Sequence, residues 1–339
     1  IRECIGCNMC VAAETAGCEL RCTQNPTISE EWRRGWHPER VPAAPRAEST
    51  LIIGSGPAGL EAALTLARAG HEVTLAEARD DFGGRVLREA RIRNLAAWGR
   101  VADYRLYQLR QMANVTLYAG SALDADAVAE FGADHVLLAT GAQWRRDGGG
   151  RTRLTAIDGF DGSALTPDDI LDGTPVDGPV VIYDDDHYYM ANALAAQLAM
   201  QGHAVQIVTP LPTLGSWMAQ TLEQPRMIAE LHRLGVQMHP YTAATAWTGT
   251  GLAVQRADTG ETLPEIAVRT LLSVTSRLPD MTLSEALSAR GIAHRLIGDA
   301  EAPGTIQSSV YSGHRHAREI LGQVPEDGLF QRERATLFL

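Results

Sequence analysis

The sequence predicts an α/β protein of two doubly wound domains, the second inserted in the first, preceded by a short cysteine-bearing segment. Three observations lead to this prediction. A strand, a glycine-rich turn, a helix and a second strand follow one another over 50–77, and a second strand–helix–strand unit covers 180–208. A strand at 295–297 then runs into a glycine and an acidic residue. Alternating strands and helices of this kind build parallel sheets with helices on both faces.

The strand near 297 sets the order of the two domains. The turn after this strand is expected to lie at the same ligand site as the turn at Gly54, because ligands bind outside the carboxyl ends of the strands of one sheet. We therefore expect a cysteine segment and linker over 1–48, a first domain over 49–155 and 285–339, and a second domain over 156–284.

Length and charge limit the possible classes of protein. At 339 residues the chain exceeds what a single hydrophobic core usually serves. No apolar run reaches the roughly 20 residues of a membrane-spanning helix, and the first residues lack a signal-peptide pattern, so we expect a soluble, cytoplasmic protein. A net charge of −11 argues against nucleic acid and anionic membranes as partners. Because the chain begins at Ile1 and not at Met, we expect that something preceded it.

All five cysteines lie in the first 22 residues. Cys4, Cys7 and Cys10 follow one another at three-residue steps, and Cys18 and Cys22 come later. Three thiolates at these steps can surround a 4Fe-4S cubane while a fourth comes from further along the chain. Zinc sites usually pair two Cys-x2-Cys units or add histidine, and disulfide frameworks do not leave large cysteine-free domains. The spacing therefore favours a 4Fe-4S cluster over zinc or a redox disulfide, with Cys18 or Cys22 as the fourth ligand.

A glycine fingerprint opens the first domain. Gly54, Gly56 and Gly59 lie between an apolar strand and an alanine-rich helix. The first glycine makes the tight turn, the second lets the backbone approach a pyrophosphate, and the third lets the helix pack on the strand. The helix then points the positive end of its dipole at the phosphates. Glu77 ends the next strand, where an acid accepts hydrogen bonds from the adenosine ribose. This combination predicts an adenine-nucleotide site, not an unliganded turn.

Further turns are expected beside the same nucleotide. The glycine pair at 83–84 permits a second close approach of backbone, and the strands near 137 and 297 each end in a small-residue turn. The residues predicted to bind the nucleotide are Gly54, Gly56, Pro57, Ala58, Gly59, Glu77, Ala78, Gly84, Arg85, Ala139, Thr140, Gly141 and Asp299.

The second strand–helix–strand unit lacks these glycines. Its strand at 180–183 is joined to its helix by the sequence Asp-Asp-Asp-His-Tyr-Tyr at 184–189. Three carboxylates would repel a pyrophosphate, and the tyrosines would block the approach of the backbone. We therefore expect no ordinary NAD(P)H site here. The loop is interpreted as a solvated acidic helix start, with a metal site as the alternative.

Several motifs in the same order resemble the trimethylamine dehydrogenase family of iron–sulfur flavoproteins, within the superfamily of NADH:flavin oxidoreductases and 2,4-dienoyl-CoA reductases. These motifs are CIGCNMC at 4–10, CTQNP at 22–26, RRGWHPE at 33–39, the fingerprint at 54–59, ATGA at 139–142, IGDAEAP at 297–303 and GHR at 313–315. The similarity covers most of the chain and corresponds to the C-terminal half of those enzymes.

The resemblance implies ligands, cofactors and partners. It makes Cys4, Cys7, Cys10 and Cys22 the cluster ligands and leaves Cys18 as an extra thiol. It favours ADP at the fingerprint, with FAD as the alternative used by the dienoyl-CoA reductase relatives. An N-terminal barrel, absent from this sequence, would carry FMN and oxidise an amine, and the cluster would pass electrons to an electron-transferring flavoprotein. A homo-oligomer, a dimer, is also expected, and no catalytic residue can be named within this chain.

The predicted function is therefore the electron-transfer part of an iron–sulfur flavoprotein amine dehydrogenase or N-demethylase. One alternative is an NAD(P)H-dependent reductase of the enoate or 2,4-dienoyl-CoA type, which requires a dinucleotide pocket in the second domain. Another is a stand-alone electron-transfer or bridging subunit.

Overall fold

The computed structural model describes residues 2–30 and 40–322 and divides into two compact units. The described residues up to 90, together with 97–142 and 279–322, form the first unit; residues 91–96 and 143–278 form the second. The second unit is thus inserted in the first, as the sequence predicted. The RRGWHPE motif at 33–39 lies outside the described residues.

The unit boundaries differ from the expected 155 and 285. The chain leaves the first unit at Ala142 and returns at Pro279. Strands β5 (Ala142–Trp144) and β13 (Arg277–Pro279) pair with each other at this crossing. The glycine-rich stretch at 148–150 has the composition of a linker, but a Cβ on Gly148 would lie 2.8 Å from side chains of Ile157 and Phe160. The stretch is therefore packed within the second unit.

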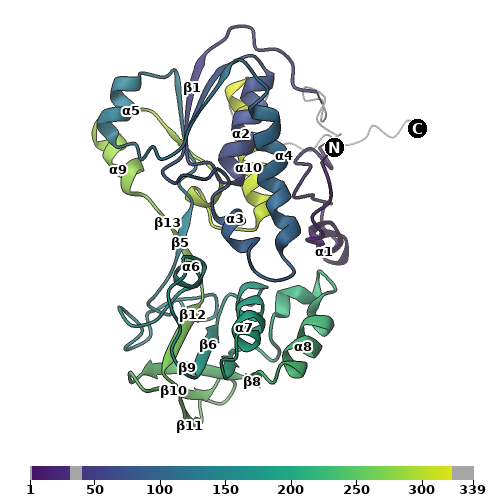
Figure 1. Ribbon diagram of the computed structural model, residues 1–339, viewed down its shortest axis with the longest axis vertical. Helices are drawn as coiled ribbons and strands as arrows, with labels where there is room; N and C mark the ends of the chain where they lie inside the picture. Colours follow the sequence, from purple (N-terminus) through teal and green to yellow (C-terminus); the bar gives the residue numbers. More distant parts are fainter. Residues whose placement is uncertain (1, 31–39, 323–339) are drawn as a thin grey trace, which may run out of the picture. The chain divides into compact units, whose positions relative to one another are not determined.

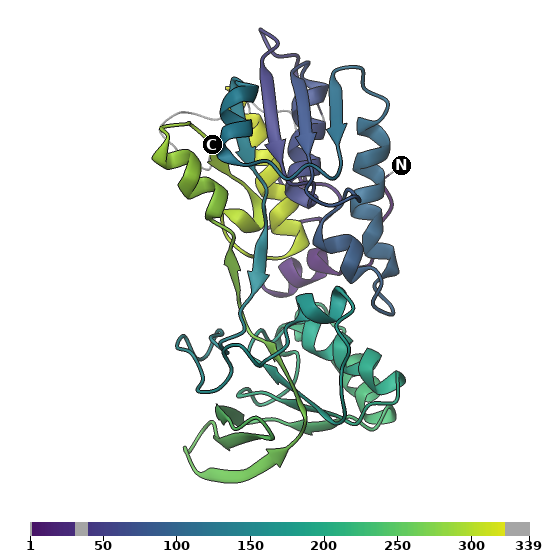
Figure 2. The same ribbon diagram turned by 60° about the vertical axis from the view of Figure 1, so that its left-hand side comes forward.

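The first unit is built on a five-stranded parallel sheet of order β14-β4-β1-β2-β3. Its strands are β1 (Ser49–Ile53), β2 (Glu72–Ala76), β3 (Val115–Tyr118), β4 (His135–Leu138) and β14 (Arg295–Leu296). Ile53 at the end of β1 is in register with the last residues of both neighbouring strands. Figure 2 shows β1 and β2, coloured purple to blue, side by side in this sheet. The carboxyl ends of the strands consequently share one edge.

Helices cover both faces of this sheet. Helices α2 (Pro57–Arg68), α4 (Arg100–Leu109) and α10 (Ile306–Ile320) lie together on one face, whereas α5 (Ala125–Phe131) and α9 (Thr282–Ala289) lie on the other (Figure 1). Helix α2 buries nearly every side chain because alanine, glycine and leucine dominate its sequence. The shorter elements are α1 (Met9–Thr15), α3 (Arg85–Glu89), η1 (Ala96–Gly99) and η3 (Gly298–Ala300).

The second unit contains a four-stranded parallel sheet of order β12-β6-β7-β8 and an antiparallel sheet of order β11-β10-β9 that the sequence did not predict. The parallel strands are β6 (Val180–Asp184), β7 (Val205–Val208), β8 (Gln237–His239) and β12 (Thr270–Val274). The antiparallel strands are β9 (Thr242–Trp247), β10 (Gly251–Arg256) and β11 (Thr262–Ala267). Its helices are α6 (Pro167–Leu171), α7 (Met190–Met200), α8 (Gln224–Arg233) and η2 (Ser216–Ala219). Over the described part of the chain, no helix has both the length and the apolar composition needed to cross a membrane.

Candidate functional site: a nucleotide loop beside a cysteine segment

The glycine turn after β1 is as tight as the fingerprint predicts. Gly54 has φ +101°, and a Cβ there would lie 2.3 Å from the carbonyl oxygen of Ala139. A Cβ on Gly59 would lie 2.0 Å from the carbonyl oxygen of Gly54. Both positions therefore exclude every side chain. Gly56 is different, because a Cβ there would meet nothing within 4 Å. Open space of this kind, beside the start of α2, is what a closely bound pyrophosphate requires.

Loops from distant parts of the chain converge on this space. A Cβ on Gly84 would lie 2.9 Å from the Cα of Gly56, and one on Gly298 would lie 2.5 Å from the Cβ of Ala58. Gly141 has φ +80° and open space around its Cβ position. Four turns thus meet at the start of α2: those that follow β1, β4 and β14, and the one before α3. The residues predicted to bind the nucleotide lie on or beside these turns.

Glu77 is held in place by its own chain. Its Oε2 accepts hydrogen bonds from the backbone N of Ser55 at 2.9 Å and the Ser55 hydroxyl at 2.5 Å, and its Oε1 accepts one from the backbone N of Arg79 at 3.0 Å. The Ser55 hydroxyl also accepts a hydrogen bond from the backbone N of Gly83. Ser55 therefore orients the acid and fastens the second glycine turn. Sequence reasoning missed this role, although a small hydroxyl residue inside the fingerprint was a visible signal.

The remaining predicted residues lie around the same loops with differing environments. Arg85 donates a hydrogen bond to the carbonyl oxygen of Ala142, and the Thr140 hydroxyl donates to the carbonyl oxygen of Asp280. Asp299 accepts hydrogen bonds from Gly304 and Ser309 and so shapes the loop after β14. Pro57 begins α2, and Ala78 is exposed just after Glu77.

Replacing Gly56 with alanine is expected to separate nucleotide binding from folding. The residue has φ −62° and ψ 178°, which alanine adopts without strain, and its Cβ would meet no protein atom. We expect an unfolding midpoint close to that of the unmodified protein and a loss of most of the co-purified nucleotide, measured by mass spectrometry after extraction. Gly59→Ala is the contrasting variant, because its Cβ collides with backbone and should impair folding itself. Full nucleotide content in Gly56→Ala would contradict this placement of the pyrophosphate.

The cysteine segment lies in the same unit. Cys4 and Cys10 are exposed, whereas Cys7 and Cys22 are half-buried. The Sγ of Cys7 is 3.1 Å from the Thr23 hydroxyl, and the backbone N of Gly6 donates a hydrogen bond to the Sγ of Cys4 at 3.3 Å. Burial raises the pKa of the Cys7 thiol, and Cys22 and Cys4 add to this effect because they lie near it. The segment therefore gathers Cys4, Cys7 and Cys22 around one place.

Zinc and a cubane cluster need different spacings of their thiolates. Four thiolates around zinc lie about 3.8 Å apart, since each Zn–S bond is about 2.3 Å. Within residues 2–30 and 40–322, no three cysteine sulfurs lie within 4.8 Å of one another. A cubane needs wider spacing, because each thiolate meets a different iron. The preference for an iron–sulfur cluster over zinc therefore rests on the Cys-x2-Cys-x2-Cys pattern of the sequence.

A buried polar network fastens the cysteine segment to the nucleotide domain. The Arg105 guanidinium, which is fully buried, donates to the carboxylate of Glu61 at 2.7 Å and to the side-chain oxygen of Gln24 at 3.0 Å. Gln24 in turn donates to the carbonyl oxygen of Glu3. Arg100 donates to the carbonyl oxygen of Cys4. Helices α2 and α4 are in this way linked to both ends of the cysteine segment.

Sequence analysis did not identify this network. Glu61 and His314 also meet inside it, with Nδ1 and Oε1 3.2 Å apart, and the two positions are 253 residues apart in the chain. Arg105 lowers the pKa of Glu61 to about 2 against the opposing effect of burial, which is the largest single influence. The signal that could have found Glu61 is a single acid on an otherwise apolar, alanine-rich helix.

The acidic loop of the second unit is buried, so the expectation of a solvated helix start was wrong. Asp184, Asp185 and His187 are all at most 2% exposed. The carboxylate of Asp184 accepts hydrogen bonds from the backbone N of Asp186 at 3.3 Å and of His187 at 2.9 Å. The backbone N atoms of Asp185 and Asp186 donate to the carbonyl oxygen of Val274. The amides that would bind phosphate are thus already paired, which agrees with the predicted lack of an ordinary NAD(P)H site.

Residues 150–153 also enclose the acidic loop. Asp185 accepts hydrogen bonds from the Thr152 hydroxyl at 2.6 Å and from the backbone N of Arg153 at 3.2 Å. A Cβ on Gly150 would lie 2.2 Å from the Asp185 carboxylate. Among the described residues, no three of the loop's acids and His187 offer ligand atoms within 4.8 Å of one another.

Asp184→Asn is expected to change how stability depends on pH. Burial raises the pKa of Asp184 to about 7, partly opposed by His187. Because the folded pKa exceeds the ordinary value of 3.8, the stability that the protonated acid contributes is present at low pH and is lost as pH rises through about 7. Asparagine keeps an acceptor but does not titrate. The variant should therefore gain stability relative to the unmodified protein between pH 5 and 8, on the order of 1.4 kcal/mol per pH unit at most.

Urea unfolding of both proteins at pH 5 and pH 8 measures this difference. Asp258→Asn, at an exposed site, is the control and should follow the unmodified protein at both pH values. Equal pH dependence in Asp184→Asn and the unmodified protein would contradict the assignment.

Comparisons with known proteins agree with the two-unit fold. Residues 48–163 match the pyridine nucleotide-disulphide oxidoreductase family, and residues 165–249 match the OYE-like second alpha/beta domain family. Dimethylamine dehydrogenase of Hyphomicrobium sp. (strain x) is 35% identical over 96% of this chain and 49% of its own length.

Two solved structures are similar over nearly the whole chain. Histamine dehydrogenase from Rhizobium sp. 4-9 superposes with a TM-score of 0.94 at 41% identity, covering 100% of this chain and 54% of that one. The 6-hydroxypseudooxynicotine amine oxidase from Pseudomonas geniculata N1 superposes with a TM-score of 0.90 at 43% identity, covering 94% and 48%. The chain spans about half the length of the curated relatives it matches. On the combined evidence of motifs, domains and relatives, the chain belongs to the trimethylamine dehydrogenase family.

Proposed function

We propose that this chain is the electron-handling part of an iron–sulfur flavoprotein that oxidises a simple or methylated amine. The observation that carries the proposal is the buried Glu61–Arg105–Gln24 network, because it joins the cysteine segment to the helix that follows the nucleotide fingerprint. A cluster and a nucleotide held in one packed unit suit a relay of electrons, since their distance and surroundings are then fixed.

Cys4, Cys7, Cys10 and Cys22 would hold a 4Fe-4S cluster. When bound, the cluster supplies one-electron transfer between a flavin and a protein acceptor. The protein's own contribution is to tune the thiolates, because hydrogen bonds to ligand sulfurs influence the reduction potential of such clusters. The Thr23 hydroxyl beside Cys7 and the backbone N of Gly6 beside Cys4 would supply such hydrogen bonds.

The fingerprint would hold ADP in preference to FAD. The start of α2 and the open space at Gly56 suit a pyrophosphate, and the Glu77 carboxylate, oriented by Ser55, can still accept a hydrogen bond from a ribose hydroxyl. The nucleotide in this proposal is structural, because electrons would leave through the cluster.

The proposed partners are those that the family resemblance implies. An N-terminal FMN barrel would contain the amine pocket, and an electron-transferring flavoprotein would accept the electrons. The net charge of −11 would help to steer a basic acceptor surface. A homodimer in the cytoplasm completes the proposal.

The principal alternative is an NAD(P)H-dependent reductase of the enoate or 2,4-dienoyl-CoA type. The buried acidic loop counts against it, because Asp184 already occupies the amides that would meet a dinucleotide phosphate. A stand-alone electron-transfer subunit is the other alternative, and it shares the cluster and the nucleotide with the leading proposal.

Anaerobic purification with quantification of iron, sulfide and released nucleotide tests the proposal. We expect close to four irons and four sulfides per chain together with ADP. Recovery of FAD with rapid reduction by NADPH would support the reductase, and zinc in place of iron would overturn the electron-transfer role. Co-purification with an FMN-containing barrel protein would separate the amine dehydrogenase from the stand-alone subunit.

A further inference from the structure

Three side chains meet at the edge of the first sheet where the strands begin. Glu48 directly precedes β1, His71 directly precedes β2, and His135 is the first residue of β4. The backbone N of Glu72 donates to the carbonyl oxygen of Glu48, which sets the starts of β1 and β2 side by side. His135 is in register with Thr50, which lies two positions after Glu48 and therefore on the same face of β1. Strand pairing thus brings the three side chains together.

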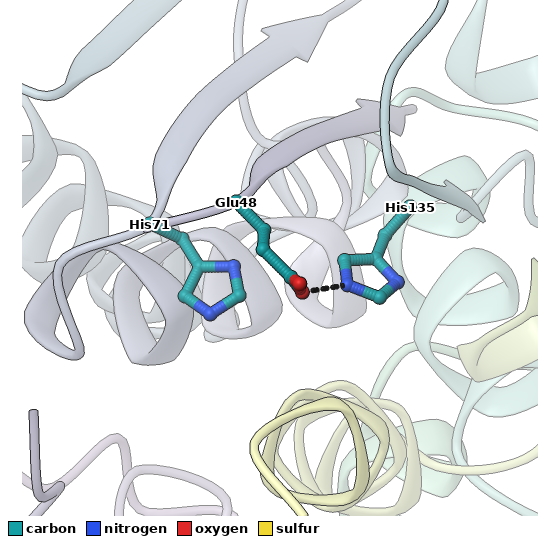
Figure 3. Close-up of side chains that lie close together, drawn as sticks. All are labelled: Glu48, His71 and His135. Carbon is teal, nitrogen blue, oxygen red and sulfur yellow. Dashed lines mark hydrogen bonds and ion pairs between the residues drawn. The ribbon is translucent and has the colours of Figure 1, made fainter. Parts of the chain in front are cut away.

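The side-chain geometry is that of a small binding site. One potential ligand atom from each of the three residues lies within 4.8 Å of the other two. The Nε2 of His135 is 2.7 Å from the Oε2 of Glu48, and the two imidazole rings have centroids 6.1 Å apart. Figure 3 shows the carboxylate of Glu48 between the two imidazoles.

The His71 imidazole is the observation that points to a ligand. The side chain is 2% exposed, and its Nδ1 is buried with no hydrogen-bond partner among the described residues. In Figure 3 a ring nitrogen of His71 faces the Glu48 carboxylate. Burying such a nitrogen without a partner costs free energy. The Thr50 hydroxyl, on the same face of β1, is also buried and has no hydrogen-bond partner in the described part of the chain.

We propose that Glu48, His71 and His135 bind one divalent transition-metal ion of the Zn²⁺ type. Two imidazoles and one carboxylate form a donor set that zinc accepts, with water in the fourth position. Binding would give the buried His71 nitrogen its missing partner and would replace the His135–Glu48 hydrogen bond.

The surrounding charges permit this binding. Arg46 pairs with Glu48, but its side chain is largely exposed and can turn into solvent. Asp134 adds a nearby carboxylate, whose oxygen accepts hydrogen bonds from the backbone and hydroxyl of Ser49. With a bound dication, the net charge of the ion and these carboxylates would therefore be close to zero.

The metal would have a structural role that is separate from the proposed electron transfer. It would join the starts of β1, β2 and β4, whereas the nucleotide loops follow the opposite ends of the same strands. Its loss would loosen the sheet edge without removing a cluster or a nucleotide ligand.

Equilibrium dialysis of the purified protein against Zn²⁺, with metal content measured by mass spectrometry, tests the proposal. The cysteines can also bind zinc, so the informative quantity is the difference between variants that share all cysteines. We expect His71→Ala to bind one zinc equivalent less than the unmodified protein. His294→Ala is the matched control, because His294 is hydrogen-bonded to Ser284 and Ile292 and is not one of the three clustered residues, and it should bind the full amount.

A second variant protects the test against misfolding of His71→Ala. Glu48→Gln removes one ligand charge from a residue that is only half-buried, and it should also lose the zinc equivalent, along with the rise in unfolding temperature that Zn²⁺ gives the unmodified protein. Equal zinc content in the unmodified protein and in a folded Glu48→Gln variant would overturn the proposal. Neither outcome depends on iron content, so failure here would leave the proposed electron-transfer function standing.

Discussion

Cys22→Ser is expected to remove almost all iron and sulfide from the protein, whereas Cys18→Ser should retain close to the full amount. A 4Fe-4S cluster needs four thiolates, and a serine hydroxyl does not ionise in the range where a thiol does. Cys22 and Cys4 are the thiols near enough to the half-buried Cys7 to raise its pKa, after the larger effect of burial. The Sγ of Cys18 instead lies 3.7 Å from the carbonyl oxygen of Ala16.

Iron and sulfide analysis of the two serine variants, with the visible absorption and the low-temperature electron spin resonance of the reduced proteins, measures this effect. Released nucleotide provides the folding control, because the nucleotide loops contain no cysteine and should keep ADP in both variants. If Cys18→Ser lost the cluster and Cys22→Ser kept it, the fourth ligand would be Cys18 and the ligand set implied by the family resemblance would be wrong.

The fold and the glycine loop could be predicted because their causes are local. A Cβ at Gly54 or Gly59 would collide with the backbone, so both positions require glycine. The spacing of the glycines in the sequence therefore predicts the loop. The buried strands likewise show as apolar runs, and β1, β4 and β6 lie where the sequence predicted them. Even the insertion was readable, since β14 pairs with β4 in the sheet that contains β1.

The features that could not be predicted depend on contacts between distant positions. Arg105 meets Glu61 across 44 positions and Gln24 across 81, and no local pattern announces either contact. The burial of Asp184 was misjudged for the same reason, because the residues that enclose its loop come from 150–153 and from Val274. Three adjacent acids are typical of a solvated loop, and the sequence alone does not indicate that these distant segments enclose them.

Arg105→Met is expected to destabilise the protein by about 3–5 kcal/mol, because it leaves the buried Glu61 carboxylate without its cation. Arg105 is fully buried and Glu61 nearly so, with 2.7 Å between their atoms. Arg146→Met provides the control: Arg146 pairs with Asp169 at a half-exposed site, so its loss should cost under about 1 kcal/mol. Urea unfolding at pH 7 measures both variants.

Unfolding measurements at acidic pH distinguish the electrostatic contribution of the Glu61–Arg105 pair from the contribution of side-chain packing. Glu61 has a folded pKa of about 2, below the ordinary value of 4.5, so the stability it contributes is present above about pH 4.5 and is lost as pH falls towards 2. In Arg105→Met that depression should largely disappear, so the difference in stability between the variant and the unmodified protein should narrow as pH falls from 5 to 3. A difference that stays constant over this range would mean that Arg105 acts through its packing and its hydrogen bonds to Gln24, and not through its charge. The double variant Glu61→Gln, Arg105→Met should be more stable than Arg105→Met alone, since it removes the uncompensated buried charge.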